Sequence, residues 1–188
     1  MHGNRKRFLR AFLLAALIGV LMAPRPCRAA SAAEIDRGVN KALKTLYAKN
    51  PTAKSLGAKA KAVLVFPEIV KGGFMVGAQF GEGALREGNR TTGYYNSVAA
   101  SYGFQAGLQK FGYALFFMTP SALEYFKKSD GWEIGSGPSI VVVDEGMAKS
   151  LSTTTLQSDV YAFFFSQKGL MAGLGLQGTK ITRFQPSK

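Results

Sequence analysis

A stripe of apolar residues at helical spacing follows residue 32 of this 188-residue chain. Steps of three and four residues place the stripe on one side of an α-helix, which predicts a helix that buries that side. The stripe consists of Ile35, Val39, Leu43, Leu46 and Tyr47. Ser31 and Glu34 have the spacing of a capping box at the start of this helix. Asn50-Pro51 is typical of a helix start, and we expect a short second helix to end near Ala60.

From residue 62 onward, runs of β-branched and aromatic residues alternate with turn-forming residues, which predicts strands. The first run, 62–66, is expected to stop at Pro67, because proline lacks the N–H that a strand ladder uses. Further strands are predicted at Phe74–Phe80, Gly93–Ala99, Tyr113–Met118, Ile140–Val143, Val160–Phe165, Leu170–Leu176 and Lys180–Phe184. Thr119-Pro120 predicts the start of another short helix, with Leu123 and Phe126 facing inward.

Many short strands at regular spacing predict a sandwich or a barrel. A glycine–apolar–x–small–glycine repeat, starting at Gly73, Gly103 and Gly169, supports closure. Two glycines four residues apart lie on one face of a strand and allow sharp coiling, although a cavity for a lipid tail is an alternative interpretation. Turn formers and hydroxyls predict exposed loops at 82–92 and 145–158. The predicted fold is α+β and β-dominated, an antiparallel β-barrel-like core with about three helices packed on its surface.

Residues 1–32 have the organisation of a secretory signal peptide. A basic segment ends at Arg10, an apolar run occupies residues 11–23, and Ala30-Ser31-Ala32 offers small residues for cleavage. The apolar run has 13 residues, fewer than the roughly 20 that a membrane span needs. We expect cleavage after Ala32 and an exported single domain over residues 33–188, periplasmic or associated with the cell envelope. A lipoprotein anchored through Cys27 is the alternative, but the preceding Arg25-Pro26 lack the small residue that this processing needs.

Positive charge is concentrated just behind the predicted leader. The chain has 24 Lys and Arg against 11 Asp and Glu, and residues 1–32 hold six of the basic and none of the acidic residues. Residues 33–188 therefore carry 18 basic and 11 acidic residues, an excess of seven positive charges. From Arg37 to Lys61 there are seven basic residues and no acidic residue. Such a block suggests nucleic acid in an intracellular protein and anionic lipid or cell-wall polymer in an exported one. A solvated basic face without a partner is the alternative.

The sequence offers little catalytic chemistry. His2 and Cys27 are the only histidine and the only cysteine of the chain, and both lie in the predicted leader. Most metal-ligand sets and most nucleophile–base pairs need one of these residue types. Asp144-Glu145 is a carboxylate pair that a hard cation could use, but a turn at a strand end explains it as well. We expect no enzyme activity, no metal, no cofactor and no nucleic-acid partner.

Three segments closely resemble the SYLF family of lipid-binding domains. They are Ala62–Phe74, Ser129–Ser139 and Phe165–Thr179. The resemblance extends from about Glu34 to Phe184, and the chain looks like an exported bacterial member. The resemblance implies a β-barrel core with helices on its surface, and no catalytic residues. Eukaryotic members stand beside SH3 or FYVE modules, bind phosphoinositides and in some cases bundle actin.

The expected function is non-enzymatic binding of anionic phospholipid or phosphoinositide headgroups at a membrane surface. Lysine ammonium groups would hold the phosphates, and we expect no actin partner for an exported protein. The candidate lipid-binding residues are Lys41, Lys44, Lys54, Lys59, Lys61, Lys71, Lys127, Lys128 and Lys168. The alternative is a barrel that carries an apolar ligand in the cell envelope. That alternative needs a hollow interior, whereas the many phenylalanines predict a filled one.

Overall fold

One curled sheet of eight strands forms a half-barrel and dominates the structure, which is a computed structural model. It describes residues 30–74, 76–102, 107–143, 158–168, 176 and 178–187. The helices are α2 (Ala32–Lys49), α3 (Pro51–Lys59) and α4 (Pro120–Lys128). The strands are β1 (Ala62–Phe74), β2 (Val76–Glu87), β3 (Arg90–Tyr102), β4 (Gly107–Phe117), β5 (Trp132–Glu133), β6 (Ile140–Val143), β7 (Val160–Lys168) and β8 (Lys180–Phe184). The predicted β-dominated α+β class is thus confirmed.

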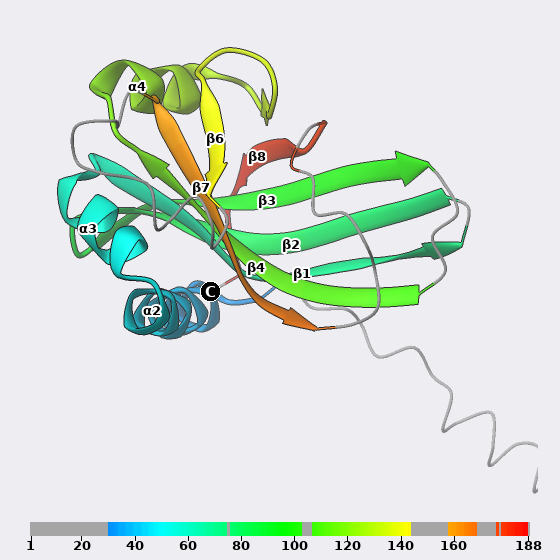
Figure 1. Cartoon of the computed structure of the whole chain (residues 1–188). Coiled ribbons are helices and arrows are strands. Elements are labelled where there is room, and N and C mark those ends of the chain that lie inside the picture. The colour runs from blue at the N-terminus through cyan, green and yellow to red at the C-terminus, as the bar shows by residue number, and fades with distance from the viewer. Residues whose placement is uncertain are drawn as a thin grey trace, which may run out of the picture.

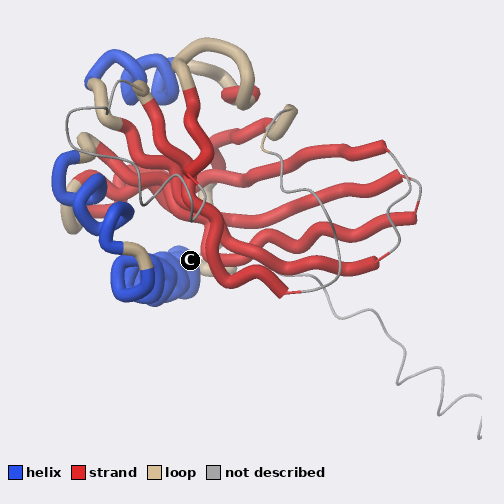
Figure 2. The backbone as a smooth tube through the Cα atoms, viewed as in Figure 1, coloured by secondary structure: helices blue, strands red, loops and turns tan. Residues whose placement is uncertain are grey.

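The strand order across the sheet is β5-β8-β3-β2-β1-β4-β7-β6. Neighbouring strands run antiparallel except for β6 and β7, which are parallel. The sheet is therefore mixed, and β5 and β6 form its two edges. Figures 1 and 2 show the helices gathered around one end of the sheet, while β1, β2, β3 and β4 extend beyond them.

Both predicted N-terminal helices are present, and their end residues explain where they begin and end. The Ser31 side chain accepts a hydrogen bond from the Glu34 N–H, and the Glu34 carboxylate accepts one from the Ser31 N–H at 2.8 Å, which completes the capping box. Asn50 closes α2 by donating its N–H to the Leu46 carbonyl at 2.8 Å. Its side chain opens α3 by accepting from the Ala53 N–H at 2.9 Å. One residue therefore fixes the corner between the two helices.

The prediction that the first strand stops at Pro67 is wrong. β1 continues to Phe74 and pairs with β2 and β4 on both sides of a bulge. The register shifts between Val65 and Val70 on the β2 side, and between Phe66 and Ile69 on the β4 side. Because the bulge takes Pro67 out of the ladder, its missing N–H interrupts no regular pairing.

The predicted loop at 82–92 is also wrong. β2 runs to Glu87 and β3 starts at Arg90, so that the connection is the two-residue turn Gly88-Asn89. Glycine within β2 reflects close packing and not a loop, because a Cβ at Gly83 would lie 2.7 Å from Cδ1 of Phe66. Residues 145–157 of the second predicted loop lie outside the described residues.

The glycine repeat does not lie along a single strand. Gly73 lies one residue before the end of β1 and pairs directly with Gly77 of β2, so the two glycines stand on neighbouring strands. Residues 103–106 and 169–173 of the other two copies fall outside the described residues, as does most of the predicted strand 170–176. The predicted strand Phe74–Phe80 is wrong in its start, because Phe74 ends β1 and β2 begins at Val76. The remaining predicted strands and the helix predicted to start at Thr119-Pro120 are confirmed, and Leu123 and Phe126 are buried as expected.

Different elements cover the two faces of the sheet. On one face, α4 and the segment around Trp132 cover one hydrophobic core, and on the other face α2 and α3 cover a second. Neighbouring residues of β1 belong to different cores, because strand side chains alternate between faces. Leu64 faces the first core and Val65 the second, and neither is exposed to solvent. Burying such a side chain contributes about 1.5–3 kcal/mol, so both covers stabilise the fold.

The close packing at Gly83 predicts a difference between two glycine-to-alanine changes. Gly83→Ala should lower the free energy of unfolding by about 1–3 kcal/mol, since the new methyl group would overlap the Val65 carbonyl and the Phe66 ring. Gly72→Ala is the control, because its Cβ would meet only the Leu108 side-chain end at 3.3 Å and Gly107 O at 3.8 Å. Urea denaturation measures both, and equal stabilities would contradict the packing of β1 against β2.

Candidate functional site

The predicted basic block forms one exposed surface on α2, α3 and the residue before β1. We call it the helical basic surface; it consists of Arg37, Lys41, Lys44, Lys49, Lys54, Lys59 and Lys61. All seven side chains are exposed, whereas the apolar stripe beneath them is buried against the sheet. None of the seven forms an ion pair with another residue in the described part of the chain. Their charges are therefore available to a partner.

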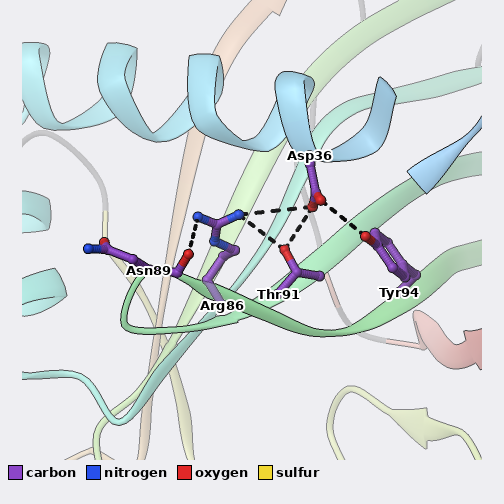
Figure 3. A network of polar contacts seen from close by, with 5 residues as sticks. All are labelled: Asp36, Arg86, Asn89, Thr91 and Tyr94. Atoms are coloured by element: carbon purple, nitrogen blue, oxygen red, sulfur yellow. Dashed lines mark hydrogen bonds and ion pairs between the residues drawn. The ribbon is translucent and has the colours of Figure 1, made fainter. Parts of the chain in front are cut away.

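Asp36, the acidic residue just before this block, points inward and ties α2 to the sheet (Figure 3). Its carboxylate accepts hydrogen bonds from Thr91 Oγ1 at 2.7 Å and from the Tyr94 hydroxyl at 3.1 Å. Arg86 Nη1 lies 3.9 Å from the same carboxylate and donates to Thr91 Oγ1 at 3.1 Å, while Nη2 donates to the Asn89 carbonyl at 2.9 Å. The network joins α2 to the β2–β3 hairpin and leaves the solvent side of the helix basic.

The tyrosines beside these helices are held in apolar surroundings. Burial raises the pKa of Tyr47, whose ring packs against Phe116 at a centroid distance of 6.4 Å. Burial, and then the hydrogen bond to Asp36, raise the pKa of Tyr94. Gly57 of α3 lies against the Tyr47 ring, where a Cβ would come 2.8 Å from Cζ. These contacts hold α3 close to α2, and so hold the lysines of both helices on one rigid surface.

The structure places five of the nine candidate lysines on this surface and the other four elsewhere. Lys127 lies on α4 and pairs with Glu87 at 2.6 Å, a contact that lowers the pKa of Glu87. Lys128, also on α4, pairs with Glu124 at 3.2 Å. Lys168 is exposed near the end of β7, directly opposite Lys110 of β4. The α4 lysines are thus partly compensated and lie on the other side of the sheet from α2.

Lys71 differs from all other candidates because only 8% of its surface is exposed. It stands on β1 directly between Gln79 of β2 and Gln109 of β4, both of which are buried. Gln79 Nε2 donates to Thr179 Oγ1 at 3.3 Å. The sheet therefore separates Lys71 from the helical basic surface. Lys71 belongs to a row of buried polar side chains with Gln79 and Gln109. Nothing in the amino-acid sequence around residue 71 distinguishes Lys71 from the exposed lysines.

A second exposed surface was not predicted from the sequence. Beyond α2, the same sheet face that the helix covers carries large apolar side chains in contact with solvent, which we call the distal face. Its residues are Val70, Val76, Phe80, Val98 and Leu108. The alternation of apolar residues in the strands predicts a buried face, and only the structure shows that none of the described helices covers this part.

The described carboxylates do not form a cation site. Asp159 accepts hydrogen bonds from the Ser139 hydroxyl and N–H and from Thr119 Oγ1, and these bonds lower its pKa. Asp144 and Glu145 lie outside the described residues. In the described ranges, no three His, Cys, Asp or Glu side chains are grouped to hold a metal ion. None of the helices there is long and apolar enough to cross a bilayer.

Comparison with known families gives a match to the second half of the chain. Residues 98–186 match the family model Ysc84, whose description is "Las17-binding protein actin regulator". The matched part begins within β3 and includes α4 and all strands from β4 to β8, whereas α2 and α3 precede it. No curated protein matches the chain.

The Asp36 network predicts a measurable coupling between α2 and the hairpin. Asp36→Ala should lower the free energy of unfolding by about 1–3 kcal/mol, because it leaves the Thr91 and Tyr94 hydroxyls without their acceptor and Arg86 without its ion-pair partner. Asp130→Ala, which removes an exposed carboxylate, should change it by less than about 0.5 kcal/mol.

A double-mutant cycle separates this coupling from the effect of each residue. Asp36→Ala combined with Arg86→Met should cost less than the sum of the two single changes, by about 0.5–3 kcal/mol. Additive losses in urea denaturation would show that Asp36 and Arg86 act independently and that the network does not attach the helix.

Proposed function

Through residues 98–186 the chain is a member of the SYLF-domain family, and on this premise we propose that it binds anionic phospholipid surfaces, phosphoinositide headgroups included. The family is associated with lipid binding and actin regulation. The observation that carries the proposal is the helical basic surface, seven exposed cations with no carboxylate among them. The function is one of binding, since the chain from residue 33 onward has neither histidine nor cysteine.

The strength of such binding follows from the number of cations that approach the membrane together. Each lysine or arginine close to an anionic leaflet contributes roughly 1 kcal/mol. Four to seven of them, held on one rigid surface, give attachment that weakens as salt shortens the screening length from about 10 Å at 0.1 M to about 3 Å at 1 M. Headgroups with more phosphate should bind better, because each ammonium group acts as a point charge.

The packing of both cores favours a surface function over that of a carrier. Aromatic rings fill the core under α4, where Phe126 lies 5.1 Å from Phe117 and 5.6 Å from Trp132 between ring centroids. In the core under α2, Phe116 lies 5.2 Å from Phe163. An apolar ligand in the described part of the barrel would have to displace these rings.

We also propose that residues 1–32 direct export and that the domain acts in the cell envelope, periplasmic or attached to a membrane. In that compartment the partner is anionic lipid, and neither actin nor nucleic acid is available. Cleavage after Ala32 would remove Ser31 and with it the capping box of α2, whereas cleavage after Ala29 or Ala30 would keep it. Mass spectrometry of the native N-terminus distinguishes these sites.

Neutralising the helical basic surface should weaken binding to anionic vesicles. Changing Lys41, Lys44, Lys54 and Lys59 to Gln should reduce the affinity for phosphatidylglycerol vesicles at 0.1 M salt by between about 100- and 1000-fold, at roughly 1 kcal/mol per charge. Vesicle flotation over a range of lipid concentrations measures the affinity. The four positions are exposed, so the thermal unfolding midpoint should stay close to that of the wild type.

The matched control removes four positive charges, the same number, from other parts of the molecule. It changes Arg90, Lys127, Lys128 and Arg183 to Gln, all of which are exposed. This variant should keep most of the affinity. If it loses binding while the helix variant keeps it, the lipid site lies on the α4 side and the proposed surface is wrong.

A further inference from the structure

The distal face is a continuous apolar surface on four adjacent strands. Val70 of β1 pairs directly with Phe80 of β2, and Phe80 pairs with Val98 of β3. Directly paired side chains lie about 5 Å apart on the same face of a sheet. Leu108 of β4, opposite Gly72, and Val76 of β2 extend the surface toward the strand ends. No break separates these side chains in the register.

This surface is the uncovered continuation of a buried one. Ala84 of β2 and Ala114 of β4 are fully buried in the core beneath α2 and α3. Steps of two residues along β2 lead from Ala84 to Phe80 and Val76 on the same face. Exposure rises along this path, to 50% for Phe80 and 58% for Val76. Figure 2 shows that the helices stop short of this part of the sheet.

Charged residues flank the central register row on both sides. The row crosses seven strands and reads Lys168, Lys110, Val70, Phe80, Val98, Lys180 and Glu133. All three lysines are exposed, and Lys110 pairs with Glu68 at 2.9 Å. Glu82, on the same face, accepts a hydrogen bond from the Ala30 N–H at 3.2 Å. The face is therefore an apolar centre flanked by lysines and carboxylates, and positive charge without a described ion-pair partner lies beside it on the helical basic surface.

The helical basic surface adjoins this face. Gly38 of α2 packs against Pro67, where a Cβ would lie 3.3 Å from Cγ, directly before the bulge that leads into the distal part of β1. Lys41 lies three residues after Gly38 and so on the same side of the helix. Both surfaces belong to one side of the sheet.

We propose that the distal face inserts into the interfacial region of an anionic lipid surface, with its lysines on the phosphates and its apolar side chains among the upper acyl chains. The inference rests on the proposed lipid binding and adds a second contact to it. α2 stands above the sheet by about one helix diameter, roughly 10 Å, so the sheet meets the membrane tilted, with Val76 and Leu108 deepest. Lysine stems reach along apolar surface while their ammonium groups stay in water.

Charge complementarity selects lipid over a second copy of the chain. The cations of the helical basic surface beside the face have no ion-pair partner in the described part of the chain, and two copies packed through their distal faces would bring two such surfaces toward each other, where like charges repel. A lipid surface supplies phosphate at the level of the lysines and hydrocarbon at the level of the valines and Phe80, as amphipathic membrane-surface elements require. A contiguous exposed apolar patch is in general a sign of such an interaction site.

Threonine substitutions on the distal face test the proposal. Val76→Thr, Phe80→Thr and Leu108→Thr together keep strand-forming residues and remove the apolar surface. The triple variant should bind phosphatidylglycerol/phosphatidylcholine vesicles about tenfold more weakly or worse, and the residual binding should become more sensitive to salt. The control changes two large exposed apolar residues of other described elements, Val142→Thr and Tyr125→Gln, and should bind as the wild type does.

A fluorescent probe provides a second measurement, independent of affinity. The domain from residue 33 has no cysteine, so Leu108→Cys carries a single environment-sensitive label. When the protein binds the same vesicles, the emission of this label should shift to shorter wavelength. The emission of a label at Ser121→Cys on α4 should not shift. If the protein binds without an emission shift at residue 108, and the triple variant has wild-type affinity, the proposal that the distal face inserts is wrong. The proposed binding of headgroups would still hold.

Two other outcomes also contradict the inference. If the wild type binds no anionic vesicles, the proposed function fails and the inserted face fails with it. If sedimentation shows a dimer that the triple variant turns into a monomer, the face is an interface between two copies and not a lipid contact.

Discussion

The structure depends on the need to cover both faces of one sheet. Side chains alternate along each strand, so the central strand β1 sends Leu64 to one face and Val65 to the other, and both are fully buried. No single helix layer can bury two faces. α4 and the segment around Trp132 cover one, and α2 with α3 cover the other. The basic helices therefore stand where the second face needs a cover, and their solvent side is left for charge.

The cover on the α2 side is incomplete, and this determines the functional character of that side. α2 crosses the sheet near the end around which the helices gather, and Asp36 and the contact of Gly38 with Pro67 hold it there. Beyond this crossing the strands continue with the same apolar alternation, and none of the helices in the described ranges lies above them. One side of the molecule thus combines a cationic helix surface with an apolar sheet surface, a pairing that suits an anionic membrane.

Local signals in the sequence predicted the helices and most strands, whereas contacts between distant segments remained hidden. Ser31, Asn50 and Thr119 act on neighbours within a few residues, and their capping roles are confirmed. Pro67 and Gly83 were misinterpreted, because a bulge and the closeness of β1 to β2 decide their conformation. The lysines on α2 and α3 were recognisable from their place off the apolar stripe. The burial of Lys71 and the exposure of Phe80 depend on elements far away in the chain, so no local pattern indicates them.

The most direct test of the account is the orientation of the domain on a lipid surface. Nitroxide labels at Ala48→Cys on α2 and Ala58→Cys on α3, both exposed positions, would be compared with one at Ser121→Cys on α4. Electron paramagnetic resonance then measures how readily a water-soluble relaxation agent reaches each label on phosphatidylglycerol vesicles. The account predicts reduced access at residues 48 and 58 and unchanged access at 121. Reduced access at 121 with free access at 48 and 58 would contradict it.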